Sequence, residues 1–172
     1  NFEIYEKFKS STLLQYSAFF GSIYCFKFLL LNSENNDFNI LLEYSIAGGN
    51  IDIVHITENE IHEDIENKQQ LLNTAILFMQ NDLIEYIIEY YDTEIDVECY
   101  IKCILSSNYA ALKKLMELDN IESFDKFYQP IDRALYYEQF PFFYFLVTLN
   151  DNFTNYNKIF YCVNNKELFN LI

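Results

Sequence analysis

Residues 13–26 read Leu13-Leu14-Gln15-Tyr16-Ser17-Ala18-Phe19-Phe20-Gly21-Ser22-Ile23-Tyr24-Cys25-Phe26, and a related phrase returns at residues 41–54 as Leu41-Leu42-Glu43-Tyr44-Ser45-Ile46-Ala47-Gly48-Gly49-Asn50-Ile51-Asp52-Ile53-Val54. Both phrases hold an apolar segment of helix length, a short break and a second apolar segment. Five residues recur 28 positions apart, and these are Leu14, Tyr16, Ser17, Gly21 and Ile23, which return as Leu42, Tyr44, Ser45, Gly49 and Ile51. Weaker copies begin at Leu71 and Cys99, and two more follow in residues 130–149 and 156–172. A spacing near thirty predicts stacked helical hairpins, because one hairpin cannot bury its own apolar face.

The composition supports an all-α chain. It is 51% hydrophobic and 19% aromatic, which is typical of a packed core despite a net charge of -15. Three glycines and two prolines are too few for tight β-turns or a flexible linker. We therefore predict a single α-solenoid of about five to six helix-turn-helix repeats over residues 1–172. The expected units are 12–39, 40–68, 69–96, 97–126, 127–153 and a partial unit 154–172.

The breaks between the two segments of each unit predict how the first helix ends. Gly21 and Gly49 suit the left-handed conformation that commonly follows a helix C-terminus. Asn81 and Asn108 stand at the later breaks, and Asn tolerates that conformation better than most residues. Residues of one further column are small, and these are Ser17, Ser45 and Ala75. Small residues in one column predict a close approach of helices, so a bulky side chain at Ser45 is expected to destabilise the fold more than one at an exposed Glu43.

The sequence features that bear on cellular location favour an intracellular protein. No apolar run is long enough to cross a membrane, and the first residues lack the apolar segment of a signal peptide. The chain begins with Asn1 and not Met, as expected of a processed chain or of a piece of a longer one. The four cysteines lie in apolar helical phrases, where a thiol behaves as a small hydrophobe, and they are Cys25, Cys99, Cys103 and Cys162. We expect a cytoplasmic, reducing location, with an association with the cytoskeleton as one form of it.

Thr12 to Ser22, followed by Phe26 to Leu30, resembles the ankyrin repeat, whose signature runs Thr-Pro-Leu-His-x-Ala-Ala-x-x-Gly-His before an aliphatic helix ending in Leu-Leu. The matching residues are Thr12, Leu14, Ala18, Gly21, Leu29 and Leu30, whereas Leu13, Gln15, Ser17 and Ser22 depart from the signature. The sequence of the first two repeats, and the bias of the whole chain toward Asn, Ile, Tyr and Phe, look like those of the divergent ankyrin-like proteins of protozoa such as trichomonads. The resemblance implies a curved solenoid that binds other proteins, chiefly through its concave helical face, and carries no catalytic residues. The missing Pro at Leu13 and the short spacing leave the protruding β-hairpin fingers of that family in doubt.

Enzymatic and metal-binding functions have little sequence support. Cys99 and Cys103 are four residues apart, as two ligands on one helix face would be, yet a structural zinc site needs four ligands and no second pair stands nearby. His55 and His62 are seven apart, which matches no simple helical metal pair. Gly48-Gly49 is not followed by the Lys-Ser/Thr of a phosphate-binding loop. We expect no metal, no cofactor and no enzyme, and a metal-dependent enzyme is the remote alternative.

Charge and exposed aromatics suggest where a partner could bind. Between Glu58 and Glu98 twelve acidic residues are opposed by Lys68 alone, which argues against nucleic acid and favours a basic protein surface or peptide. The alternative is a solvated face that keeps an aromatic-rich protein soluble. The aromatic run at residues 136–145 cannot all point inward from two short helices, although most of it is expected to be core. The candidate contact residues are Glu43, Glu63, Asp64, Glu94, Tyr137 and Tyr144.

Two functions follow from these patterns. The first is a non-catalytic scaffold that binds a protein through its concave helical face and acidic loops. The alternative is a constitutive component of a larger assembly, such as the cytoskeleton, which the apolar end at Leu171-Ile172 favours because a solenoid terminus otherwise needs a polar capping repeat.

Overall fold

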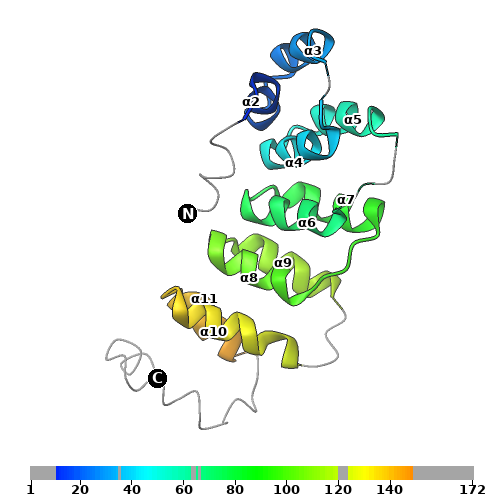
Figure 1. Cartoon of the computed structure of the whole chain (residues 1–172). Helices are drawn as coiled ribbons and strands as arrows, with labels where there is room; N and C mark the ends of the chain where they lie inside the picture. Colours follow the sequence, from blue (N-terminus) through cyan, green and yellow to red (C-terminus); the bar gives the residue numbers. More distant parts are fainter. Residues whose placement is uncertain (1–10, 35, 63–64, 66, 120–123, 149–172) are drawn as a thin grey trace.

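The computed structural model of the chain describes residues 11–34, 36–62, 65, 67–119 and 124–148 (Figure 1). In this part the chain forms ten α-helices and one short 3-10 helix, and no strand. The prediction of an all-α fold is confirmed for these residues. The helices are α2 (Leu13–Phe19), α3 (Ile23–Leu31), α4 (Phe38–Gly48), α5 (Ile51–Asn59), α6 (Lys68–Leu77), α7 (Asn81–Tyr91), α8 (Val97–Ser106), α9 (Tyr109–Leu118), η1 (Phe124–Phe127), α10 (Tyr128–Tyr136) and α11 (Phe140–Thr148).

Consecutive helices pair into five hairpins, here numbered hairpin 1 (α2 and α3) to hairpin 5 (α10 and α11). The first helices pack side by side, α2 on α4, α4 on α6, α6 on α8 and α8 on α10. The second helices form another layer, in which α3 contacts α5 and α7 contacts α9. Figure 1 shows the hairpins one below another, from hairpin 1 at the top to hairpin 5 at the bottom. Hairpins 2 to 4 therefore each have one face toward the preceding hairpin and one toward the following hairpin.

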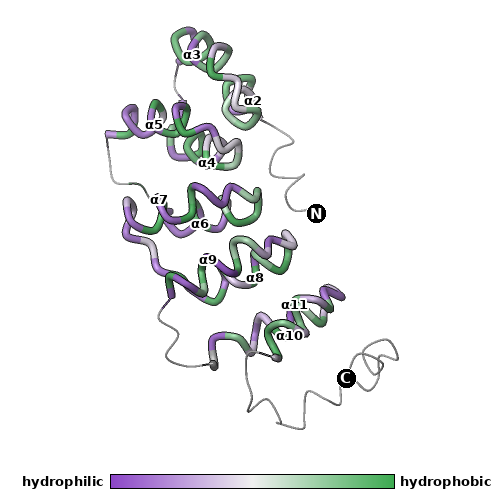
Figure 2. Tube along the Cα trace, turned by 180° about the vertical axis from the view of Figure 1, so that it is seen from behind, coloured by the Kyte–Doolittle hydropathy of each residue, from purple (hydrophilic) through white to green (hydrophobic). Residues whose placement is uncertain are grey.

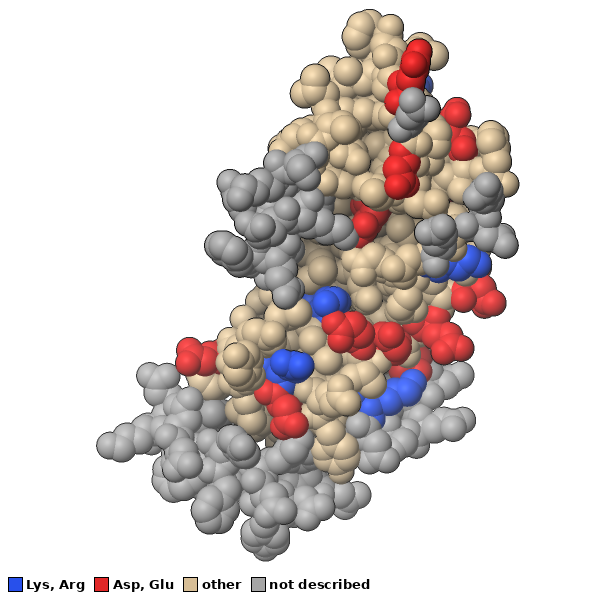
Figure 3. Space-filling view, viewed as in Figure 1, with Lys and Arg blue, Asp and Glu red and all other residues tan. Residues whose placement is uncertain are grey.

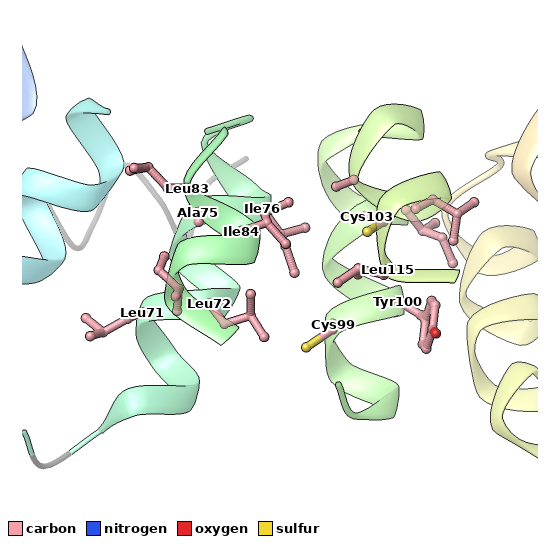
Figure 4. Close-up of a cluster of buried hydrophobic side chains, with 14 of the residues drawn as sticks. Leu71, Leu72, Ala75, Ile76, Leu83, Ile84, Cys99, Tyr100, Cys103 and Leu115 are labelled. Carbon is pink, nitrogen blue, oxygen red and sulfur yellow. The ribbon is translucent and has the colours of Figure 1, made fainter. Parts of the chain in front are cut away.

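The apolar core lies between the hairpins. Figure 2 shows hydrophobic and hydrophilic residues mixed along the helices of every hairpin, so each helix has a face to bury. In Figure 4, Leu71 and Leu83 point to one side of hairpin 3 while Leu72 and Ile76 point to the other side, toward Cys99 of hairpin 4. One buried cluster extends from hairpin 2 to hairpin 5. A second, smaller cluster joins hairpins 1 and 2, and its buried members are Leu14, Ala18, Phe26, Leu41, Tyr44 and Ile53.

Each hairpin turns at a residue with positive φ. The values are 64° at Gly21 and 73° at Gly49, and the later turns use Met79, Ser107 and Glu138 with φ of 60°, 56° and 56°. The prediction that Asn81 and Asn108 are left-handed is wrong. Asn81 is the first residue of α7, and Asn108 is the N-cap of α9 with φ of -92°. Non-glycine residues accept the strained conformation because the next amide bonds the helix five residues back, as Gln80 N does to Ala75 O at 2.8 Å.

A ladder of side-chain amides links the turns of neighbouring hairpins. Asn50 Nδ2 donates to Gly21 O at 3.1 Å, Gln80 Nε2 to Ala47 O at 3.0 Å, and Asn108 Nδ2 to Ile76 O at 3.0 Å. At the last junction Ser107 Oγ donates to Gln139 Oε1 at 3.4 Å. Each amide residue directly follows a left-handed turn residue, so the ladder fixes the register of one hairpin on the next.

The small-residue column lies where helices meet. Ser17, Ser45 and Ala75 are buried, and Ser45 Oγ lies 3.1 Å from Thr57 Oγ1 on the second helix of its own hairpin. Leu14 and Leu42, which recur in the repeated phrase, are buried as well. The backbones of hairpins 1 and 2 approach each other closely one residue before a turn, at Gly48. A Cβ there would lie 2.3 Å from Ala18 O and 2.7 Å from Phe19 O, so no side chain fits between α2 and α4 at this point.

The predicted unit boundaries are close to the hairpins but not identical with them. Helix α4 begins at Phe38 and α6 at Lys68, so boundaries after 39 and 68 cut the first turns of these helices. Pro130 is the third residue of α10 and Pro141 the second residue of α11. Both lie in a first turn, where a proline removes no helical hydrogen bond. The partial unit 154–172, with Cys162, Leu171 and Ile172, lies outside the described residues.

Candidate protein-interaction surface

The predicted contact residues lie on separate elements. Glu94 is exposed in the segment between α7 and α8. Tyr137 caps the C-terminus of α10, and Tyr144 lies on α11, with 40% and 56% of their surface exposed. No hydrogen bond or ring contact joins these three residues to one another in the described part of the chain. Glu63 and Asp64 lie outside the described residues.

Glu43 has a structural environment that the sequence did not predict. Its carboxylate Oε1 accepts hydrogen bonds from Gln70 Nε2 at 2.9 Å and from Thr74 Oγ1 at 3.0 Å. Both donors are on α6, whereas Glu43 is on α4. The expectation of an exposed Glu43 is therefore wrong, because the side chain is half-buried and ties hairpin 2 to hairpin 3.

The acidic band is broken by lysines that are distant in sequence. Figure 3 shows acidic side chains scattered down one face, with basic side chains among them in the lower half. Lys114 Nζ lies 3.3 Å from Glu85 Oε2, and Lys102 Nζ lies 2.7 Å from Glu98 Oε1. Both acids belong to the segment that the sequence opposes with Lys68 alone. The folded band is therefore less negative than the sequence indicates, and Glu94 is an acid in it without an ion pair.

A polar cluster between α5 and α7 is centred on the carboxylate of Glu58. Glu58 is on α5, and its side chain is 9% exposed. Tyr86 OH donates to both of its oxygens, at 2.9 and 3.0 Å, Tyr91 OH donates to Oε1, and His55 Nδ1 lies 2.9 Å from Oε2. Burial, followed by the bond to Glu58, raises the pKa of the Tyr86 and Tyr91 phenols above their ordinary range. The phenols thus remain hydrogen-bond donors to the carboxylate at neutral pH.

Sequence reasoning missed this cluster although a signal existed. Counted from the left-handed turn residue of each hairpin, the other four hairpins carry an aliphatic side chain where hairpin 2 has Glu58, and these are Leu30, Ile88, Met116 and Val147. An acid in an aliphatic column indicates a buried carboxylate that needs donors. Two tyrosines, 28 and 33 positions later, supply them. The geometry ties α5 to α7 and leaves the half-exposed ring of His55 at the surface.

The candidate metal ligands do not form a site. Among the described residues no group of three or more His, Cys, Asp and Glu side chains could hold a metal ion. Cys99 and Cys103 are buried thiols, and Cys99 Sγ accepts a hydrogen bond from Gln69 Nε2 at 3.2 Å. Burial raises the pKa of the Cys99 thiol to about 12 and raises that of Cys103 as well, so both stay protonated at neutral pH. Cys25, which also stands in an apolar phrase of the sequence, is exposed on α3.

Comparison with known proteins gives a limited match. Residues 31–115 match the model of a family described as a domain of unknown function, DUF3447. This stretch extends from the end of α3 through most of α9. No curated protein and no solved structure matches the chain. The description of this family states no activity, so the match shows a similarity of part of the chain and indicates no function.

The described helices contain no candidate for a membrane span, because none combines sufficient length with sufficient apolar character.

Proposed function

We propose that this chain is an ankyrin-like α-solenoid that acts as a non-catalytic scaffold and binds a protein partner. The observation that carries the proposal is the common register of the five hairpins, whose turn residues recur at Gly21, Gly49, Met79, Ser107 and Glu138. Hairpins stacked in one register present their first helices and connecting segments as one extended surface, which is the kind of surface that repeat proteins use for binding.

The resemblance to ankyrin repeats gains support from the start of α2. Thr12 Oγ1 accepts from Gln15 N at 3.2 Å, and Gln15 Oε1 accepts from Thr12 N at 2.8 Å. Thr12 stands where the ankyrin signature has its Thr, and this capping box explains why Gln can replace the signature His at position 15. Of the remaining departures, Ser17 is buried, whereas Leu13 and Ser22 are exposed.

The proposed contact surface comprises the concave side of the first helices together with Glu94, Tyr137 and Tyr144. A net charge of -15 favours a basic peptide or protein surface and repels nucleic acid. Exposed tyrosines supply large contact areas at low entropic cost. The unpaired thiols of Cys25, Cys99 and Cys103 support a reducing, cytoplasmic location.

Affinity capture of the tagged chain from its own cells tests this proposal. We expect one or a few basic proteins to be recovered at low salt and lost at high salt, because rim charges are screened. Glu94→Lys should weaken capture. Glu117→Lys on α9 is the matched control, since it makes the same charge change at an exposed acid whose nearest lysine, Lys113, is 3.7 Å away. Equal recovery by both variants, or no saturable partner at low salt, would show that the acidic surface does not bind a protein.

A constitutive place in a large assembly, such as the cytoskeleton, is the second candidate. An exposed apolar surface on hairpin 1 favours it, since Leu13 and Phe20 are each 74% exposed. In this case recovery in one large assembly should resist high salt, and the Glu94→Lys variant should be recovered as efficiently as the natural chain.

A further inference from the structure

The layer of second helices carries a group of aromatic rings at the junction of hairpins 2 and 3. We call it the tyrosine patch and define it by His55 of α5 and by Tyr86 and Tyr90 of α7. The rings of Tyr86 and Tyr90 stack with centroids 5.1 Å apart and an interplanar angle of 14°. The ring of His55 lies at 83° to that of Tyr86, with centroids 5.6 Å apart. Tyr90 is nevertheless 62% exposed, and the side chain of His55 is 50% exposed.

The carboxylate of Glu58 holds the patch from below. Tyr86 OH donates to both of its oxygens, at 2.9 and 3.0 Å, and His55 Nδ1 lies 2.9 Å from Oε2. Tyr91, which also donates to Glu58, is buried, and its ring centroid lies 5.0 Å from that of Tyr90. Rings that are already held in place lose little conformational freedom when a ligand binds to them. The patch is therefore a preformed surface.

The packing of the hairpins does not require a ring at position 90. Counted from the left-handed turn residue of each hairpin, the equivalents of Tyr90 are Asn32, Glu60 and Leu118. Glu60 and Asn32 are exposed, and Leu118 is 39% exposed. The column thus lies at the surface and accepts polar, charged and aliphatic side chains. The exposed aromatic ring in hairpin 3 indicates a contact outside the chain, because aromatic side chains are enriched at binding surfaces.

Charge selects the kind of ligand. Helices α5 and α7 carry no lysine or arginine and five carboxylates, which are Asp52, Glu58, Asp82, Glu85 and Glu89. Lys114 of α9 pairs with Glu85 at 3.3 Å. Glu89 is exposed and directly precedes Tyr90. The patch therefore combines exposed ring surface with a negative environment, and both features attract a cation.

Arginine fits this combination better than other cationic or planar groups. Its guanidinium is planar and weakly hydrated, so it stacks on an aromatic ring while its N–H groups remain available to carboxylates. The lysine ammonium is a strongly hydrated point charge. Nucleic-acid bases also stack on exposed rings, but their phosphates are repelled by a chain with a net charge of -15.

We propose that the tyrosine patch binds an arginine side chain of the basic partner protein, with the guanidinium stacked on the ring of Tyr90 and attracted by the carboxylates of α5 and α7. Glu58 and Tyr86 act as positioning residues, since they hold the ring that Tyr90 stacks on. The inference rests on the proposed function for the basic character of the partner. It adds a contact on the second helices, separate from Glu94 and from the concave side of the first helices.

Titration of the full chain with two capped peptides of equal length tests the proposal. One peptide alternates arginine with glycine, and the other alternates lysine with glycine, so that their charges are equal. We expect isothermal titration calorimetry to show binding of the arginine peptide that is about two- to fivefold tighter than that of the lysine peptide. In proton NMR spectra the arginine methylene signals should shift upfield on binding, because protons above an aromatic ring are shielded.

Substitutions of exposed tyrosines separate stacking from charge. Tyr90→Ala should abolish the upfield shift and lower the affinity of the arginine peptide to that of the lysine peptide. Tyr90→Phe keeps the ring and should retain both the shift and the preference. Tyr24→Ala is the matched control, since it makes the same change at a tyrosine of α3 that is 87% exposed, and it should have no effect. All variants are checked for an unchanged helical circular dichroism signal.

The outcomes distinguish this inference from the proposed function. Glu94→Lys should weaken the binding of both peptides to the same extent and leave the preference for arginine in place. Equal affinities of the two peptides, combined with partner capture that is sensitive to Glu94→Lys, would uphold the proposed function and overturn the inference. An upfield shift that survives Tyr90→Ala, equal effects of Tyr24→Ala and Tyr90→Ala, or no binding of the arginine peptide would also overturn it.

Discussion

Replacing Gly48 by alanine tests the packing of hairpins 1 and 2 with a single methyl group. Gly48 is the last residue of α4, and a Cβ at this position would lie 2.3 Å from Ala18 O and 2.7 Å from Phe19 O. Both neighbours are backbone atoms at the end of α2. They cannot yield as a flexible side chain does, so α2 must move away from α4.

The expected cost can be separated from the ordinary effect of the substitution. In an unhindered helix, alanine in place of glycine stabilises by about 1 kcal/mol. Relieving the clash requires α2 to shift by roughly 1 Å along the small cluster of hairpins 1 and 2, and overpacking of this kind costs about 3 kcal/mol. We therefore expect a net loss of about 2 kcal/mol in the free energy of unfolding.

Urea denaturation followed by circular dichroism measures this loss, and amide hydrogen exchange locates it. Exchange should accelerate in α2 and α3 and remain slow in α8 and α9, which belong to the other cluster. Gly21→Ala is the control. Its Cβ would lie 3.5 Å from Asn50 Cβ, an ordinary contact, so only the left-handed φ of 64° is penalised, by about 1 kcal/mol. A Gly48→Ala chain as stable as the natural one, or more stable, would refute the close approach of α2 and α4.

Three further predictions concern buried polar groups. Asn108→Ala should lower the free energy of unfolding by about 2 kcal/mol, measured by urea denaturation. The reason is that Asn108 donates to Ile76 O and Asn81 Oδ1 and accepts from Ala111 N. A smaller loss for Asn108→Ala than for Asn50→Ala would contradict this prediction. Alkaline pH should unfold the chain, because burial raises the pKa values of the Tyr86, Tyr91 and Tyr100 phenols above the ordinary 10.0. These phenols contribute stability below pH 10 that is lost as the pH rises further. A spectrophotometric titration in which all fifteen tyrosines ionise together near pH 10 with the fold intact would be inconsistent with this prediction. In the folded chain at neutral pH, Cys99 and Cys103 should resist alkylation until denaturant is added, as measured by peptide mass spectrometry, and rapid labelling of either would mean that the space between hairpins 3 and 4 opens readily.

The period of the sequence predicted the helical class and the placement of the best-preserved hairpins. The repeated Leu14 and Leu42 and the two turn glycines carry that information because their side chains, or the lack of one, are imposed by burial and by positive φ. The residue types of Met79, Ser107 and Glu138 do not indicate a positive φ. Their left-handed conformation is imposed by the helices on either side and by the bond from the following amide, so the nearby asparagines misled the prediction by one or two positions.

The surface was harder to predict than the core. Counting charges along the sequence cannot show that Lys114 reaches Glu85 on the neighbouring hairpin, or that Glu43 is engaged by Gln70. Such contacts link positions about thirty residues apart, and their geometry depends on the stacking itself. Cys25 illustrates the same limit, since it is exposed on α3 although its neighbours in the sequence are apolar.

The amide ladder has a consequence for how a chain of this kind can change in length. Each of its bonds runs from one turn to the adjacent turn only, and none spans two junctions. A duplication that copies one whole unit, from a left-handed residue to the next, supplies one donor and one acceptor and leaves every existing bond in place. Loss of a whole unit removes one of each. Gene duplication and deletion can therefore lengthen or shorten the stack without a compensating substitution, whereas an insertion of a few residues within a turn breaks the register at once.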